Sequence, residues 1–494
     1  MKNTQIGRIV LLLAGALLCR MPLGACTELS LQNAIDLALS QNTSLRITQK
    51  GEESAEAAYR SAKGGNSFSV TASSSLETNK TEGNSHVESS SNRLSASLPL
   101  YSGGKNQAAI ESSEIGIKSA ELKTERQRED LKLNVIQAYY NAVQAKKTIA
   151  VRQEAVDNYN AHYTNVNQLY SAGSKARVDV LRASVELSNA RYELIHANNV
   201  YEVRLATLRD YLNIDRNEPL ELTEEFSYNQ FAVPLTDCMN YAYGHRKDLL
   251  IDLYSLEQKE LAVKIAKAGF LPNVNLSLGT QFSGITSPSW DMEPSVSAGV
   301  SASWNIFDSG VTRAKVDTAE TERDIARLTF DKDREAIDLK LREAYYNMRG
   351  AEHQLQSTAD AVGQAEEDYY IAREKYRAGE GIMLDVLDAQ KSLSEARLNH
   401  ITAQYDYMRY KAAVENAMGI GLTEGERAAA EQLSQQPMKV LDPSVAVREM
   451  EKKIASPLLP SADTSSTNNA VVPVSATEQT FEQKIDATES EVTE

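Results

Sequence analysis

The chain has 494 residues, and its 52 Lys and Arg against 68 Asp and Glu give a formal net charge of −16. This acidic excess argues against a nucleic-acid partner, because binding to phosphates needs clustered lysine and arginine side chains. Of its three cysteines, only Cys238 lies beyond residue 26, which excludes a disulfide framework and a cysteine-based metal site.

Residues 1–26 are predicted to be an export signal. Basic residues precede an apolar run over 9–18, and small residues follow it. Arg20 ends the run short of the roughly 20 residues that a membrane-spanning helix needs. Cys26 also allows a lipoprotein cleavage site, although the residues before it fit such a site poorly.

Hydrophobic periodicity predicts a first structural repeat over 27–214. A helical pattern from Leu31 to about Lys63 gives way to the period-two alternation of a β-hairpin. A long segment with one glycine and no proline then predicts an uninterrupted helix, and a shorter helix follows a turn. The predicted bounds are 67–101 for the hairpin, 105–170 for the long helix and 178–212 for the shorter one.

The same order of elements recurs after a glutamate-rich, irregular linker over 215–234, predicted to form a belt at mid-height. Ala138–Asn141 recurs as Ala344–Asn347, and other identities keep the same offset of about 206 residues. This constancy indicates a duplicated unit whose element lengths are fixed by geometry. The second repeat covers 235–420, with a helix over 235–267, a hairpin over 273–307, a long helix over 311–376 and a helix over 384–418.

Beyond the second repeat the helical pattern is lost. Residues 421–494 form a C-terminal extension that is poor in aromatic side chains and is predicted to be disordered toward its end.

The lengths of the elements suggest how they fit together. A helix of 66 residues is about 100 Å long, and two shorter helices stacked end to end match it. Strands of about ten residues, apolar on one face and rich in Ser, Asn and Thr on the other, suit the wall of a membrane barrel, although a soluble sandwich could show the same pattern. Four strands are too few to close a barrel, so subunits would have to share one: a dimer gives eight strands and a trimer twelve.

Several motifs resemble the TolC family of outer-membrane efflux proteins, over about residues 29–425. They are the helical opening Leu29–Leu39, the strand-to-helix junctions Leu98–Gly104 and Trp304–Gly310, and the turn Tyr376–Ala389. The resemblance implies an α+β fold with a long α-helical coiled-coil barrel and two β-hairpins per subunit, which form a shared 12-stranded transmembrane β-barrel in a homotrimer.

The resemblance also implies a function. It is that of an exit channel in a tripartite efflux pump or a type I secretion system, in the outer membrane with a large periplasmic part. The implied partners are a periplasmic adaptor protein, an inner-membrane transporter and outer-membrane lipid. Because the first helix of such a fold begins well below the membrane, Cys26 lies too close to it for a lipid anchor, and we expect an unlipidated N-terminus.

No catalytic or cofactor-binding pattern is visible in the sequence. The six histidines are scattered without metal-site spacing, and Gly103-Gly104-Lys105 lacks the rest of a phosphate loop. We therefore expect neither enzymatic activity nor a cofactor. A structural coiled-coil protein of the envelope, without a pore, remains the alternative.

The turn after the second long helix holds the candidate pore residues. Asp385 and Asp388 are three positions apart and share a helix face. Arg182 is the repeat partner of Asp388, so the fold does not require a carboxylate there. The resemblance implies that both aspartates form an acidic ring at the periplasmic entrance. Asp385 and its repeat partner Asp179 could also act as helix N-caps.

The resemblance further implies a polar network that closes the entrance. Asp179 and Tyr376 match two of its members, but Gly381 stands where the family has an arginine, and Arg377 or Lys175 are candidates to replace it. The turns themselves are the expected contacts for an adaptor, through Ala172, Gly173, Ser174, Ala378, Gly379 and Glu380.

Aromatic residues have two expected roles. The pairs Tyr139–Tyr140 and Tyr345–Tyr346 lie within the long helices and are expected to be packing residues. Aromatic side chains at the strand ends are expected at a membrane interface; they are Tyr101, Phe270, Trp304 and Phe307.

Overall fold

The computed structural model describes residues 27–79, 87–287 and 290–420. The predicted signal segment with Cys26 and the predicted C-terminal extension lie outside the described residues. The described elements of the first repeat are β1 (Thr27–Leu29), α2 (Leu31–Gln41), α3 (Thr43–Gly65), β2 (Ser69–Asn79), β3 (Val87–Tyr101), α4 (Lys105–Ser171) and α5 (Arg177–Leu212). Those that follow are β4 (Leu220–Leu222), α6 (Leu235–His245), α7 (Lys247–Lys267), η1 (Ala268–Phe270), β5 (Asn273–Ser287), β6 (Asp291–Ser303), α8 (Val311–Ala378) and α9 (Met383–Met418).

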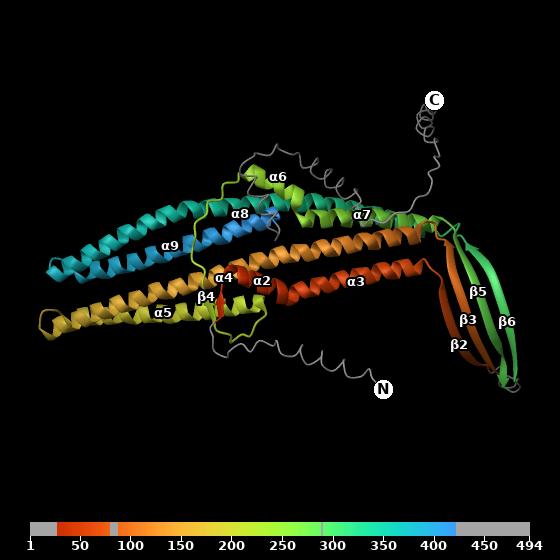
Figure 1. The fold of residues 1–494 in the computed structure, drawn as a ribbon, viewed down its shortest axis with the longest axis horizontal. Helices are drawn as coiled ribbons and strands as arrows, with labels where there is room; N and C mark the ends of the chain where they lie inside the picture. Colours follow the sequence, from red (N-terminus) through yellow and green to blue (C-terminus); the bar gives the residue numbers. More distant parts are fainter. Residues whose placement is uncertain (1–26, 80–86, 288–289, 421–494) are drawn as a thin grey trace, which may run out of the picture. The chain divides into compact units, whose positions relative to one another are not determined.

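The two hairpins form one antiparallel sheet with the strand order β2-β3-β5-β6 (Figure 1). The central pair, β3 and β5, joins the two repeats, and β2 and β6 each keep one unpaired edge in this sheet. The strands are longer than the ten residues expected, because pairs such as Glu77–Ser89 continue the ladder into the polar stretch. The sheet is therefore built equally from both copies of the duplicated unit.

The long helices α4 and α8 have 67 and 68 residues, which corresponds to about 100 Å each. Gly104 and Gly310 precede them with positive φ angles of +82° and +87°. The carboxylate of Asp308 accepts a hydrogen bond from the N–H of Thr312 at 2.7 Å, which fixes the start of α8. Within the described part of the chain, none of the helices combines the length and apolar character needed to cross a membrane.

Each long helix is flanked by two shorter ones, as the predicted lengths require. Helices α3 and α5 pack along α4, and α7 and α9 pack along α8 (Figure 1). Helix α4 also contacts α7 and α9, so it joins the first repeat to the second. The observed arrangement agrees with the predicted fold class for one subunit, which is long helices with two β-hairpins.

The prediction of one continuous helix before each hairpin was wrong. The first helix breaks at Asn42, whose side chain accepts a hydrogen bond from the N–H of Ser44 at 2.9 Å and donates one to the carbonyl oxygen of Tyr211 at 2.9 Å. The second breaks at Arg246, whose guanidinium donates to the carbonyl oxygen of Ala417 at 2.8 Å. Both breaks are stabilised by contacts with distant parts of the chain.

The linker is also more ordered than predicted. Its strand β4 pairs in parallel with β1, and Leu220 and Leu222 of β4 are buried. They belong to a cluster of buried side chains at mid-height that includes Tyr139 and Tyr140, which are packing residues as expected. Tyr346 is 62% exposed in the single subunit, and its ring lies edge-on to that of Tyr345 at 6.1 Å between centroids, so a wider packing role for it stays a prediction.

Candidate functional site

The turn between α4 and α5 is closed by backbone hydrogen bonds. Gly173 has a φ of +76°, and the N–H of Ser174 donates to the carbonyl oxygen of Leu169 at 2.8 Å. This left-handed residue after a helix is typical of a glycine C-terminal cap. Ala172, Gly173 and Ser174, the first three predicted adaptor contacts, are all exposed at the apex of this turn.

The turn between α8 and α9 has the same construction. Gly379 has a φ of +81°, and the N–H groups of Glu380 and Gly381 donate to the carbonyl oxygen of Lys375 at 2.9 and 3.1 Å. Ala378, Gly379 and Glu380 are exposed. Both predicted tips therefore offer accessible residues, most of them small, and adaptor binding there stays a prediction.

The expectation that Asp179 and Asp385 cap their helices was wrong. The N-cap residues are Ala176 and Ile382, and neither makes a side-chain cap hydrogen bond. Each aspartate is instead the third residue of its helix, in the first turn. A carboxylate in this position still interacts favourably with the positive end of the helix dipole.

The side chains of Asp385 and Asp388 are exposed on α9. Neither forms an ion pair within the residues that the structure describes. The charge of Asp388 reaches Tyr159 on α4: burial, Glu186, Tyr369 and then Asp388 raise the pKa of that phenol to about 12. The carboxylate of Asp388 is thus near enough to act on Tyr159, and it stays open to solvent.

Tyr376 lies where the helical hairpin α4–α5 meets the helical hairpin α8–α9, at the ends of both. Its ring is buried in a cluster with Val166 of α4, Ala183 of α5 and Met383 of α9. The Nζ of Lys175 lies 4.6 Å from the ring centroid. Side chains from both repeats therefore surround this one ring.

The four candidates for the closing network are only partly brought together. Lys175 contacts Tyr376, whereas Arg377 is 66% exposed at its side chain and pairs with Glu374 at 3.3 Å. The Tyr376 hydroxyl has no hydrogen-bond partner among the described residues, so it does not bond to Asp179 in this subunit. Within one subunit the structure brings together Lys175 and Tyr376, and the closing network itself stays a prediction.

One contact residue was missed in the sequence. The ring centroid of His162 on α4 lies 5.5 Å from that of Tyr376, with an angle of 51° between the rings. Burial lowers the pKa of His162 below its usual 6.5. Nothing in the local sequence marks this histidine, because it gains its role only where α4 meets α8.

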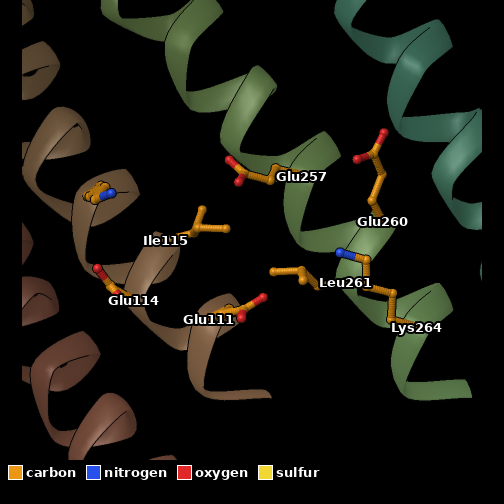
Figure 2. Close-up of a pocket in the computed structure, with 8 residues that line it drawn as sticks. Glu111, Glu114, Ile115, Glu257, Glu260, Leu261 and Lys264 are labelled. Atoms are coloured by element: carbon orange, nitrogen blue, oxygen red, sulfur yellow. The ribbon is translucent and has the colours of Figure 1, made fainter. Parts of the chain in front are cut away.

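A cavity of about 290 Å³ lies between α4 and α7 (Figure 2). Ile115 and Leu261 form part of its lining, and the charged side chains around it are Glu111, Glu114, Lys118, Glu257, Glu260 and Lys264. The two lysines balance part of the acidic charge. Across the described ranges, no group of three His, Cys, Asp or Glu side chains is arranged to hold a metal ion.

Two segments of the chain, residues 34–213 and 240–420, match the model of the outer membrane efflux protein family. The chain belongs to the outer membrane efflux protein family. Each matched segment covers one of the two structural repeats, from its first helix to its last. The predicted family and the predicted outer-membrane location are thereby confirmed.

Relatives of this efflux protein are recognisable at low identity. The probable efflux pump outer membrane protein TtgC of Pseudomonas putida is 24% identical over 316 residues, which are 61% of this chain and 63% of TtgC. Protein CyaE of Bordetella pertussis is 24% identical over 396 residues, which are 78% of this chain and 82% of CyaE. The match thus spans less than two thirds of TtgC and most of CyaE.

Solved structures share the fold. The CmeC outer membrane channel of Campylobacter jejuni has a TM-score of 0.70 and 21% identity, over 84% of this chain and 90% of CmeC. The outer membrane protein VceC of Vibrio cholerae has a TM-score of 0.68 and 19% identity, over 80% and 97% of the two chains. These likenesses confirm the predicted combination of long helices and β-hairpins within one subunit.

Proposed function

We propose that this efflux protein is the outer-membrane exit duct of a tripartite efflux pump or a type I secretion system. In this role it passively conducts cargo from an inner-membrane transporter and a periplasmic adaptor across the periplasm and the outer membrane. The observation that carries the proposal is the union, in one subunit, of a four-stranded sheet with two helices of about 100 Å. The sheet suits a membrane, and the long helices suit the span of the periplasm.

The sheet supports a homotrimer with a shared 12-stranded barrel. A sheet edge exposed to lipid leaves backbone groups without partners, and β2 and β6 each have such an edge. The register between the repeats sets Ser97 opposite Ser277 and Leu98 opposite Leu276, so polar and apolar side chains lie on opposite faces. Three copies would supply twelve strands, enough to surround an open lumen lined by the polar face.

The turns support the acidic entrance. Asp385 and Asp388 are exposed near the end of the helices that is remote from the sheet. In a trimer with these side chains facing the lumen, six carboxylates would surround one constriction, and such rings attract cations. The exposed tips, Ala172–Ser174 and Ala378–Glu380, are the surfaces that an adaptor would contact.

We assign the choice of cargo to the inner-membrane transporter. A relative from Pseudomonas putida is named a toluene efflux pump protein, and CusC of Escherichia coli is named a cation efflux system protein. Relatives of comparable similarity thus have names that refer to different cargo. A passive duct lined by small polar side chains is compatible with both kinds of cargo, and it needs no energy source of its own.

The experiment combines assembly and conductance. The mature chain, purified in detergent, is expected to have the mass of three protomers by light scattering and to insert into planar lipid bilayers as discrete conducting units. A stable folded monomer without conductance would overturn the proposal and favour the structural coiled-coil protein. Trimers that conduct only after contact with an adaptor would support the duct with a tightly closed entrance.

A further inference from the structure

The sheet formed by β2, β3, β5 and β6 carries basic charge at a single position. Arg93 of β3 is the one Lys, Arg or His side chain in these strands, and it lies near the middle of β3. The acidic side chains of the same strands all lie near the turns of the hairpins, and they are Glu77, Glu88, Asp291 and Glu293. The central part of the sheet is therefore uncharged except for this arginine.

The register of the sheet places Arg93 on its polar face. Arg93 lies directly opposite Ser73 of β2 and Gln281 of β5, and the pairing is regular around this position. Because side chains alternate along a strand, the next residue, Leu94, lies on the other face, opposite Ala72. An arginine on the lipid-facing side near the middle of a barrel is strongly destabilising. The position of Arg93 therefore agrees with a polar face that borders water.

The carboxylates of the polar face are too distant to neutralise Arg93. Glu77 lies opposite Ser89, and the run of β3 from Ser89 to Arg93 spans about 14 Å. Glu293 lies opposite Ser283 of β5, and two strand spacings combined with a two-residue step place it about 12 Å from Arg93. Charges in water that are further apart than the Debye length, about 8 Å at physiological salt, are largely screened from each other. The field around Arg93 is therefore positive.

We propose that three Arg93 side chains, one from each subunit, form a basic ring inside the barrel that binds the carboxylate and phosphate groups of passing solutes. The inference rests on the proposed function, because only a shared barrel brings three copies around one lumen. A guanidinium group can donate two parallel hydrogen bonds to such an oxyanion, and rings of arginine favour anions in pores. Asp385 and Asp388 lie at the other end of the long helices, so two filters of opposite charge would act in series.

The orientation of Arg93 is tested with single cysteines in the full mature chain. Arg93→Cys and Leu94→Cys are placed in phosphatidylcholine nanodiscs and treated with a charged, membrane-impermeant thiol reagent. Arg93→Cys should react at least about tenfold faster, because Leu94 lies on the face that the bilayer covers. Cys238 adds little background, since it is buried and burial raises the pKa of its thiol to about 12. Equal rates, or a faster reaction of Leu94→Cys, would overturn the inference.

The charge of the ring is tested in planar bilayers. Arg93→Gln should raise the permeability ratio of K⁺ to Cl⁻ about twofold to fivefold, and the pyrophosphate concentration for half-block about threefold to tenfold. Arg93→Lys should keep the ion selectivity and lose part of the block, since an ammonium group is a point charge without the planar fork. Arg313→Gln, exposed on α8, is the matched control and should resemble the wild type. In 1 M KCl, where the Debye length is about 3 Å, the differences in selectivity should shrink.

The outcomes separate the basic ring from the duct. A conducting wild type whose selectivity and pyrophosphate block are unchanged in Arg93→Gln would overturn the ring and leave the proposed function in place. Equal changes in Arg313→Gln would also overturn it, because they would show that any lost cation has this effect. A wild-type chain that forms no pore would overturn the proposed function and the ring together, and the thiol reaction would still show which face of the sheet meets the lipid.

Discussion

The hydroxyl of Tyr139, midway along α4, donates a hydrogen bond of 2.8 Å to the backbone carbonyl oxygen of Leu29, 110 positions earlier in the chain. The hydroxyl oxygen of Tyr139 in turn accepts a hydrogen bond from the N–H of Glu224 at 3.1 Å. Leu29 ends β1 and Glu224 follows β4, so one buried side chain attaches both strands of the small parallel sheet to the long helix. Burial raises the pKa of this phenol, which keeps it protonated as a donor.

Tyr139→Phe should therefore lower the free energy of unfolding by about 1 kcal/mol, because the carbonyl oxygen of Leu29 and the N–H of Glu224 lose this partner while the ring is retained. The Leu29 oxygen still accepts longer hydrogen bonds from the N–H and the hydroxyl of Thr223, each at 3.4 Å. Thermal unfolding in detergent, followed by circular dichroism, measures this loss. Tyr346→Phe is the control, since Tyr346 is 62% exposed, and it should leave the midpoint unchanged. Equal effects of the two substitutions would contradict the assigned role of Tyr139.

Substitution of Arg126 should destabilise the fold more than substitution of most other charged residues. Its guanidinium contacts Glu129 at 2.9 Å and Asp130 at 2.7 Å on α4, and the side-chain oxygen of Asn416 on α9 at 3.0 Å. Removal of one partner from a buried ion pair leaves a charge uncompensated, so Arg126→Met should cost about 3 kcal/mol, although Lys247 still pairs with Glu129 at 2.7 Å.

The exposed pair of Arg323 with Asp324 provides the comparison. Arg323→Met should change the unfolding midpoint by less than the equivalent of about 1 kcal/mol. If Arg126→Met were equally mild, the ion pairs of Arg126 would contribute to the position of α9 but little to its stability.

Removal of the charge of Asp252 should stabilise the folded protein, by an amount that depends on pH. Burial, and then the charges of Asp333 and Asp248, raise the pKa of this carboxyl to about 6 from its usual 3.8. The folded state therefore binds the proton more tightly than the unfolded state does, and stability rises as the pH falls through about 6. Asp252→Asn should raise the unfolding temperature at pH 7.5, and this difference should disappear near pH 4.

The control for Asp252 is Asp317→Asn on α8, which removes an exposed carboxylate. Its effect on the unfolding temperature should be small at both pH 7.5 and pH 4. A gain at Asp252 that persists unchanged at pH 4 would show that packing, and not the buried charge, explains it.

The burial of His162 leads us to expect that a lower pH weakens the contact between the ends of the α4–α5 and α8–α9 hairpins. Its pKa is lowered by burial, so the parted state, in which the ring is exposed and titrates near 6.5, binds the proton more tightly. Protonation therefore favours parting as the pH falls below about 6.5, and the effect levels off below the pKa of the packed state. The ring of Tyr376 contacts that of His162, and the ammonium group of Lys175 lies over the ring of Tyr376.

Conductance recorded between pH 7.5 and 5 in symmetric solutions checks the role of His162. We expect openings to become more frequent in the wild type, and His162→Phe, which keeps an aromatic ring, to abolish the pH dependence. His196→Phe, at an exposed position on α5, should preserve it. A pH dependence that survives His162→Phe would assign the titration to another group.

The acidic entrance is tested by Asp385→Asn together with Asp388→Asn. Since neither side chain caps a helix, the helices should persist, and the loss of charge should reduce cation selectivity and weaken block by trivalent cations several-fold. Reversal potentials in a salt gradient and block titrations measure both effects. Asp360→Asn, exposed on α8 away from the turn, should change neither, and an unaltered double variant would mean that these carboxylates do not line the pore.

The arrangement of elements was predictable because it follows from lengths. The absence of proline over 105–170 and the alternation over 273–307 are local signals, and they recur at a constant offset in the duplicated unit. The breaks at Asn42 and Arg246 were not predictable, since their partners Tyr211 and Ala417 are distant in the chain. A helical pattern of apolar residues continues across both breaks, so periodicity alone gives no sign of them.

The site was predictable only in part, for a similar reason. The turns and their exposed aspartates follow from glycine and acidic residues in the sequence. The contact of His162 with Tyr376 joins different repeats, and the repeat partner of His162 is Asp368, so the duplication gives no hint of it. A missing arginine at Gly381 was visible in the sequence, but the close approach of the Tyr376 backbone to this position required the structure.

The unpaired edges of β2 and β6 have a consequence for biogenesis. In the trimer proposed above, a newly exported copy would complete its sheet only by an encounter with other copies, and the rate of that step should depend on their concentration. Until that encounter, both edges could pair with any extended chain nearby, which makes the solitary subunit prone to aggregation. Dilute expression should therefore slow maturation and lengthen the time during which periplasmic proteases and chaperones compete for the chain.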